Sequence, residues 1–190
     1  MSWTRIAALL SAVALVASAT TARAADQEYG RSGPFVGAGG AYAFENFDVS
    51  GVKFDDSWGY YVKGGYRFNE WFALELDWEH YLAFDDNAGS GDTNIWMIGL
   101  NGKFYPFHGI VQPYALFGAD YAKVDPSNAA RDNGGDKGDS NVAFRFAGGL
   151  EVYATRNWAF SADVGYFLPT GKSSDYGIVP ITFGVLYRFY

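Results

Sequence analysis

The last segment of the chain, residues 178–190, alternates large apolar side chains with small or polar ones. One face of a strand over this segment would carry Ile181, Phe183, Val185, Tyr187 and Phe189, and the other Thr182, Gly184, Leu186 and Arg188. Because successive side chains of a strand point to opposite faces, the pattern predicts one apolar and one mostly polar face. A half-buried strand of a soluble protein has the same period, so the rest of the chain must decide its surroundings.

Seven further segments alternate in the same way, at about 35–44, 58–68, 72–84, 95–105, 112–123, 142–152 and 158–168. Aromatic residues make up 19% of the chain, yet the mean hydropathy is slightly negative, which favours alternating strands over buried helices. The alternation is weakest in 112–123, where we expect Tyr114, Leu116 and Asp120 to face inward. The sequence therefore predicts an all-β fold, an eight-stranded antiparallel up-and-down transmembrane β-barrel over residues 34–190.

The amino terminus has the pattern of a secretory signal. Residues 1–5 are short and basic, residues 6–17 are almost wholly apolar, and Ala22, Arg23 and Ala24 have the small-x-small spacing of a cleavage site. We interpret residues 1–24 as a cleaved signal peptide and residues 25–33 as a lead-in to the barrel. Cleavage would leave 12 basic and 21 acidic residues, and this acidity argues against nucleic acid as a partner.

Charged residues recur on the predicted inward faces. The basic ones are Lys63, Arg67, Lys103, Arg145 and Arg188, and the acidic ones are Glu75, Asp77, Glu79, Asp120, Glu151 and Asp163. An eight-stranded barrel is only wide enough for side chains to fill, and each buried charge in it needs a partner. We therefore predict a lumenal charge network, in which the basic face of 58–68 meets the acidic face of 72–84 across a hairpin at Asn69 and Glu70. The network is either a static filling, which we favour, or a gate.

The connections between the segments alternate in length. Short turns are expected at 69–70, 106–111 and 155–157, and longer polar segments at about 45–57, 85–94, 125–140 and 169–177. This layout is typical of outer-membrane barrels, which have tight periplasmic turns and longer external loops. The long segments predict an acidic external surface.

Four segments carry a recognisable pattern: 34–40 (PFVGAGG), 64–69 (GGYRFN), 112–114 (QPY) and the closing 184–190 (GVLYRFY). With these segments the chain resembles the small outer-membrane β-barrel family typified by the transmembrane domain of OmpA and by OmpX-like proteins. The resemblance implies a location in the outer membrane of a Gram-negative bacterium, among lipid and lipopolysaccharide. It also implies that the assembly machinery reads a C-terminal signal, here Gly184, Tyr187, Phe189 and Tyr190, with one tyrosine after the usual final phenylalanine. Fold does not fix activity, so the resemblance implies little about a reaction.

The candidates for catalysis and metal binding are weak. His80 lies on the outward parity of its segment with Asp85, Asp86 and Ser90 downstream, and His108 lies in a turn. Neither histidine has a nucleophile at a recognisable spacing. Asp132, Asp136 and Asp139 lack the ordered spacing of a calcium loop. We expect no enzyme activity, no cofactor and no metal.

The expected function is a structural or surface-interaction role, with the external acidic loops as the interaction surface for a possible surface ligand. Three alternatives remain open: a narrow gated pore, a lipid A modifying enzyme, and a soluble periplasmic barrel that binds an apolar ligand. The last requires something to cover the outward aromatic faces.

Overall fold

The structure is a computed structural model that describes residues 29–45, 57–84, 93–126, 140–170 and 178–190. The predicted signal peptide and most of the long connections lie outside these residues. The described part forms eight strands: β1 (Gly33–Glu45), β2 (Ser57–Arg67), β3 (Phe72–Phe84), β4 (Thr93–Phe104), β5 (Val111–Pro126), β6 (Ser140–Tyr153), β7 (Trp158–Pro169) and β8 (Ile178–Arg188). In this part of the chain, no helix is long and apolar enough to cross a membrane.

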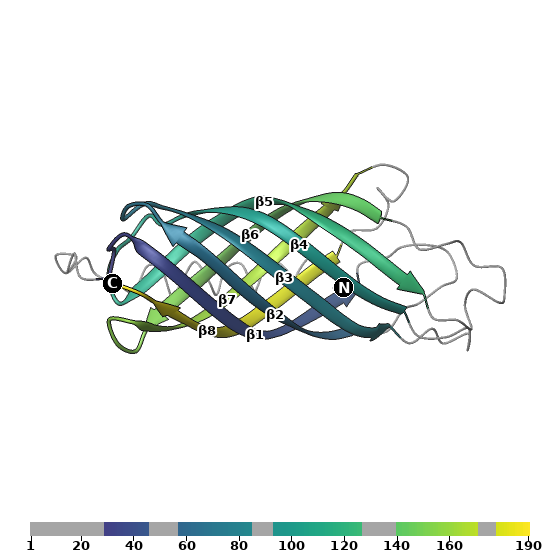
Figure 1. Cartoon of the computed structure of the whole chain (residues 1–190), viewed down its shortest axis with the longest axis horizontal. Coiled ribbons are helices and arrows are strands. Elements are labelled where there is room, and N and C mark those ends of the chain that lie inside the picture. The colour runs from purple at the N-terminus through teal and green to yellow at the C-terminus, as the bar shows by residue number, and fades with distance from the viewer. Residues whose placement is uncertain (1–28, 46–56, 85–92, 127–139, 171–177) are drawn as a thin grey trace, which may run out of the picture.

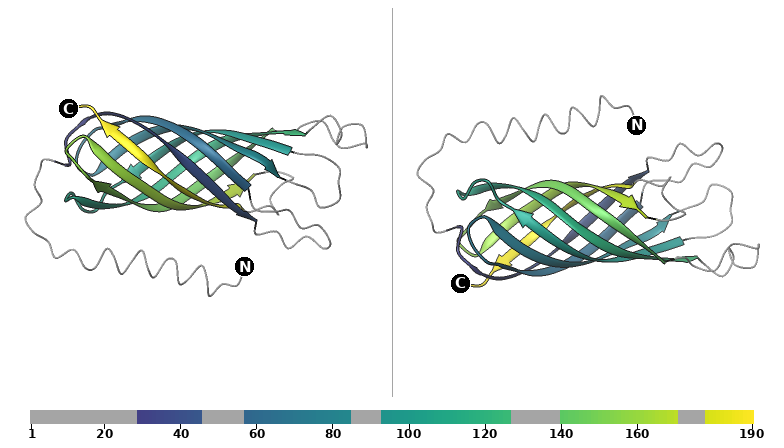
Figure 2. Two further views of the ribbon diagram at one scale, coloured as in Figure 1. Left: turned by 90° about the horizontal axis from the view of Figure 1, so that it is seen from below. Right: turned by 90° about the horizontal axis from the view of Figure 1, so that it is seen from above.

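The strands close into a single barrel (Figure 1). Each pairs antiparallel with the next in sequence, and β1 closes the ring against β8, from Phe35 opposite Arg188 to Glu45 opposite Ile178. Both views in Figure 2 show that the strands are tilted relative to the barrel axis. The predicted eight-stranded antiparallel up-and-down barrel is confirmed.

The strand faces follow the alternation in the sequence. On β5, where the alternation is weakest, Tyr114, Leu116 and Asp120 are buried, whereas Phe117 and Tyr121 are 57% and 45% exposed. The expected parity of this strand is therefore correct. Outward faces carry large apolar side chains around the ring, and this is the surface that a bilayer would cover.

Side chains of the short connections shape one end of the barrel. The Asn69 side-chain oxygen accepts hydrogen bonds from the backbone N–H groups of Trp71 (2.9 Å) and Phe72 (2.8 Å). Thr155 Oγ1 likewise accepts from Trp158 N at 3.0 Å. These side-chain caps explain why the chain reverses here. We call the end with connections 68–71, 105–110 and 154–157 the turn end, and the opposite end the loop end; β1 begins and β8 finishes at the turn end (Figure 1).

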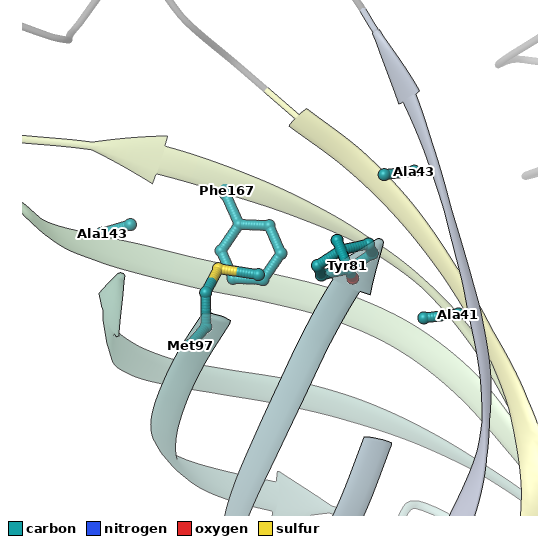
Figure 3. Packing of buried hydrophobic residues seen from close by; sticks show 6 residues of the cluster. All are labelled: Ala41, Ala43, Tyr81, Met97, Ala143 and Phe167. Atoms are coloured by element: carbon teal, nitrogen blue, oxygen red, sulfur yellow. The ribbon is translucent and has the colours of Figure 1, made fainter. Parts of the chain in front are cut away.

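The interior is filled in layers. At the loop end, an apolar cluster contains Ala41, Ala43, Tyr81, Met97, Ala143 and Phe167, with Met97 beside the Phe167 ring (Figure 3). A second cluster toward the turn end contains Phe35, Ala73, Tyr105, Tyr114, Leu116 and Leu186. Buried charged residues occupy the space between and around these clusters. The barrel is thus a packed core, as its narrow width requires.

Candidate functional site

All of the predicted inward charges lie inside the barrel. The most exposed of them is Lys63 at 7%, and Arg67, Lys103 and Glu151 have no exposed surface. They project from every strand except β1, whose inward face carries Phe35 and small residues such as Ala41 and Ala43. Small side chains on one wall leave room for the long charged ones from the other walls.

Arg145 is the centre of the network on the loop side. Its Nη2 lies 2.6 Å from Glu79 Oε1, and its Nη1 lies 3.1 Å from Asp77 Oδ2 and 3.8 Å from Asp120 Oδ1. The guanidinium also lies 4.9 Å from the centre of the Phe167 ring in the loop-end cluster. The planar guanidinium of Arg145 therefore links the carboxylates of β3 and β5 and also contacts the apolar cluster at the loop end.

Glu151 is the centre of the network on the turn side. Its carboxylate lies 2.7 Å from Arg188 Nη2 and 3.5 Å from Lys103 Nζ, and it accepts a hydrogen bond from Tyr105 OH at 2.9 Å. Lys103 also lies 2.7 Å from Glu75, which in turn lies 4.0 Å from Lys63. Strands β2, β3, β4, β6 and β8 are thereby connected through the interior.

The expected meeting of basic β2 with acidic β3 is seen only in part. Lys63 approaches Glu75, but Arg67 pairs in register with Ala73, nearer the turn end than the acids of β3. Arg67 donates instead to Gln112 Oε1 at 2.7 Å and to the Asn69 carbonyl at 3.1 Å. The cations that reach the acids of β3 most closely come from β4 and β6, because a barrel brings distant strands across one narrow lumen.

Polar and aromatic side chains complete the network. Tyr114 OH donates to Asp163 at 2.8 Å, Tyr81 OH donates to Glu79 at 2.7 Å, and the Asn101 amide donates to Asp77. Four of these network residues were not predicted from the sequence: Gln112, Tyr105, Tyr81 and Asn101. All four occupy positions of the predicted strands whose side chains point inward, and this alternation is the feature of the sequence that could have identified them.

A glycine on another strand often makes the close approach of an inward side chain possible. A Cβ added at Gly149 would lie only 2.5 Å from Tyr114 Cζ. Tyr61 OH likewise lies directly over Gly184. In the middle of the network a cavity of about 10 Å³ remains, with Lys63, Glu79 and Arg145 among its walls. That volume suits about one water molecule.

Both histidines lie away from the network. His80 is half-buried on the outer surface, stacked on Trp78 at 6.0 Å and beside Tyr60 at 5.3 Å. His108 contacts the edge of Trp71 in the turn. The remaining catalytic and calcium candidates, Asp85, Asp86, Ser90, Asp132, Asp136 and Asp139, lie outside the described residues. Within the described ranges, no cluster of three or more His, Cys, Asp or Glu residues is arranged to bind a metal.

The C-terminal residues seal the ring at the turn end. Phe189 N donates to the Pro34 carbonyl at 2.9 Å, and Tyr187 packs against Trp158 with ring centroids 4.8 Å apart. Phe189 and Tyr190 are 46% and 45% exposed. The residues predicted as an assembly signal thus lie at the closing seam, where the side chains of Phe189 and Tyr190 are about half exposed.

A closed barrel with an apolar exterior and a charged interior can be compared directly with known families. The profile of the family described as "Outer membrane protein beta-barrel domain" matches residues 10–189. The chain belongs to this family. It is therefore an outer-membrane β-barrel protein of a Gram-negative bacterium, as the sequence predicts.

Individual relatives of this outer-membrane barrel agree with the assignment. It is 27% identical over 194 residues to outer membrane protein A of Klebsiella aerogenes, a match over 96% of this chain and 55% of that protein. The chain thus spans about half the length of that relative. Neisserial surface protein A has the same fold with a TM-score of 0.66 and 17% identity, covering 84% of this chain and 99% of the other.

Two further solved structures share the fold. OprG of Pseudomonas aeruginosa has a TM-score of 0.64 and 17% identity, covering 87% of this chain and 100% of the other. Ail, the attachment invasion locus protein of Yersinia pestis, was solved with the heparin analogue sucrose octasulfate; its TM-score is 0.55 at 19% identity, covering 84% of this chain and 99% of the other. At this identity the structures establish the fold alone.

Proposed function

We propose that this protein is a closed outer-membrane barrel with a structural or surface-interaction role, in which the charge network is a static filling and the loop-end segments form the interaction surface. The observation that carries the proposal is the filled lumen. Arg145 and Glu151 link carboxylates and cations from most strands, and apolar clusters lie toward either end. If the filled lumen conducts nothing, the loops are the part of the barrel that a partner can bind.

The chemistry of the loop segments points to a cationic partner. Segments 46–56 and 85–92 together contain six aspartates and one lysine. Both connect strand ends at the loop end, so their charges add on one side of the membrane. Ail was solved with a sulfated ligand, whereas an acidic surface repels sulfate and attracts clustered positive charge.

Binding to proteoliposomes that carry the protein tests this role. The probes are polylysine and heparin, compared at low and at physiological ionic strength because exposed charges are screened by salt. The variant Asp85→Asn, Asp86→Asn, Asp92→Asn is expected to bind polylysine more weakly, while heparin binds neither form. The control Asp26→Asn, Glu28→Gln changes two acids that precede β1 in the sequence and is expected to bind like the parent. Equal polylysine binding by all three proteins would contradict the proposed surface.

A narrow gated pore is the second candidate, and one observation favours it. Lys63 is 4.0 Å from Glu75, a loose contact for a buried pair, and both line the small central cavity. Planar-bilayer recordings of Glu75→Ala and Glu79→Ala test it. Current steps that appear in these variants support a gate, and silent traces from correctly folded variants support the static filling.

We infer no enzymatic activity. The candidate residue for a lipid A modifying site in the described part of the chain is His80, whose ring is stacked on Trp78 on the outer surface. The relatives above are named for the outer membrane, the cell surface or attachment, not for a reaction. Mass spectrometry of lipid A from cells that produce the protein or its His80→Ala variant checks this inference, and a modification lost with His80 would overturn it.

The C-terminal residues Gly184, Tyr187, Phe189 and Tyr190 are proposed to be read by the outer-membrane assembly machinery, as in the family that the sequence resembles. The exposed Phe189 and Tyr190 rings at the closing seam support this role. Phe189→Ala is expected to lower the amount of assembled protein in cells while leaving refolding in detergent intact. A loss of both would indicate a purely structural role.

A further inference from the structure

The residues just before β1 lie in the turn-end mouth of the barrel. The Tyr29 carbonyl accepts hydrogen bonds from Gln112 Nε2 at 3.2 Å and from Arg67 Nη1 at 3.5 Å. The Tyr29 ring lies 5.3 Å from the ring of Tyr153, which also faces inward. Both the backbone and the side chain of Tyr29 therefore contact residues that line the lumen.

The next residues are held against the turns. Gly30 is buried, and a Cβ added there would lie 3.2 Å from Glu70 Cβ and 3.7 Å from His108 Cβ. Ser32 Oγ donates to the Phe68 carbonyl at 2.7 Å. Residues 29–32 are thus attached to the β2–β3 and β4–β5 connections before the chain enters β1.

The mouth is built to accept a peptide carbonyl. Arg67 and Gln112 have no exposed surface, and each directs an N–H group to Tyr29. The other donors of Arg67 go to the carbonyls of Asn69 and Glu70 and to Gln112. A buried guanidinium is stable only when its donors find acceptors, and the Tyr29 carbonyl is one of the two acceptors of Arg67 Nη1, beside Gln112 Oε1.

We propose that residues 29–32 are an intramolecular plug, and that Arg67, Gln112 and Tyr153 form the site that binds its carbonyl and its aromatic ring. Docking of the plug closes the turn-end mouth. The tether to β1 keeps the segment next to its site, so a modest affinity is enough to hold it there. The inference concerns the turn end and does not rest on the proposed loop surface.

Thiol labelling tests the plug, because the chain has no cysteine. Ala73→Cys places a single thiol opposite Arg67 at a fully buried inward position in the mouth. The rate of reaction with a small charged methanethiosulfonate is measured on folded protein in detergent, alone and with Gly30→Val. A Cβ at position 30 lies only 3.2 Å from Glu70 Cβ, and the branched valine adds two more carbons in this tight space. Gly30→Val is therefore expected to shift the plug out of the mouth and accelerate labelling by roughly tenfold or more.

A matched control is available at the same mouth. Gly109→Val makes the same substitution where an added Cβ meets nothing within 4 Å, and labelling is expected to stay slow. Tyr29→Ala removes the ring from Tyr153 but keeps the carbonyl, so a smaller acceleration is expected. A thiol at Ala143→Cys, in the loop-end cluster, reports general loosening and is expected to be unaffected by Gly30→Val.

Two results would overturn the plug. Fast labelling of Ala73→Cys in the parent would mean that the mouth is open with residues 29–32 in place. Equally slow labelling in the parent, Gly30→Val and Tyr29→Ala would mean that other residues close it. If Ala73→Cys fails to fold, Ala159→Cys, which is 1% exposed at the start of β7, takes its place.

Discussion

Arg188 Nη2 lies 2.7 Å from Glu151 Oε2, which links the strand that closes the barrel to β6 through the interior rather than through the sheet. Lys103 and Tyr105 converge on the same carboxylate. Because β8 is also the strand that must find β1 to complete the ring, this contact ties closure of the barrel to the filling of its lumen.

Removing the Glu151 carboxylate should therefore destabilise the barrel strongly. Glu151→Ala leaves Arg188 and Lys103 without their shared partner, and breaking a buried pair typically costs about 3–5 kcal/mol. Urea unfolding in lipid vesicles measures the change. Glu70→Ala, an exposed glutamate in a turn, is the control and should change stability by less than about 1 kcal/mol. Equal effects of the two substitutions would show that the network contributes little.

Arg145 gives a second test, because its charge is shared. Arg145→Met leaves Asp77, Glu79 and Asp120 facing one another in the lumen, and a loss of about 3–5 kcal/mol is expected. Adding Asp77→Asn and Glu79→Gln to the same chain should recover most of that loss, because uncharged amides tolerate the missing guanidinium. Additive losses in the combined variant would argue that Arg145 acts through its size rather than its charge.

Two adjacent glycines predict opposite outcomes. Gly149 lies beneath Tyr114 on the inward face, and an added Cβ would also lie 2.7 Å from the Ala162 carbonyl oxygen, so Gly149→Ala should cost about 1–3 kcal/mol through overpacking. Gly148 faces outward with nothing within 4 Å, so Gly148→Ala should leave stability within about 0.5 kcal/mol or raise it slightly. Unfolding of the two variants side by side measures the difference, and a larger loss for Gly148→Ala would reverse the assigned faces.

The lipid-facing surface makes a prediction that depends on depth. Leu100 is 53% exposed in the middle part of β4, whereas Phe107 lies in a turn. Leu100→Arg should lower the free energy of unfolding in a bilayer by about 2–4 kcal/mol, and Phe107→Arg by only about 0–1 kcal/mol. The difference arises because an arginine at the membrane interface keeps its guanidinium in water. Similar losses at both positions in vesicles would contradict the proposed placement in the membrane.

The sequence alone predicted the strands and their faces because the period of two is a local property. Even the doubtful parity of β5 follows from local alternation between Tyr114 and Asp120. The partners inside the lumen depend on register, tilt and closure, which are global properties. That is why the pairing of Arg145 with Asp77 and Glu79 was not predicted, and why Arg67 was wrongly expected to meet the acids of β3.

The contacts of residues 29–32 with the barrel also could not be predicted from the sequence. Tyr29 and Gly30 precede the first alternating segment, and nothing in their spacing marks contact with Arg67 or Gln112 far along the chain. Their position becomes evident only when the mouth of the barrel is complete.

Planar-bilayer recording of the unmodified protein tests the central claim, a closed barrel with a filled lumen, most directly. Folded protein is first identified by a gel band whose mobility changes on boiling, and is then added to a bilayer in concentrated potassium chloride. A trace without current steps after verified insertion is the predicted result, because buried side chains such as Arg145 and Arg188 fill the interior. Stable current steps from the same folded protein would contradict the closed lumen and establish the pore instead.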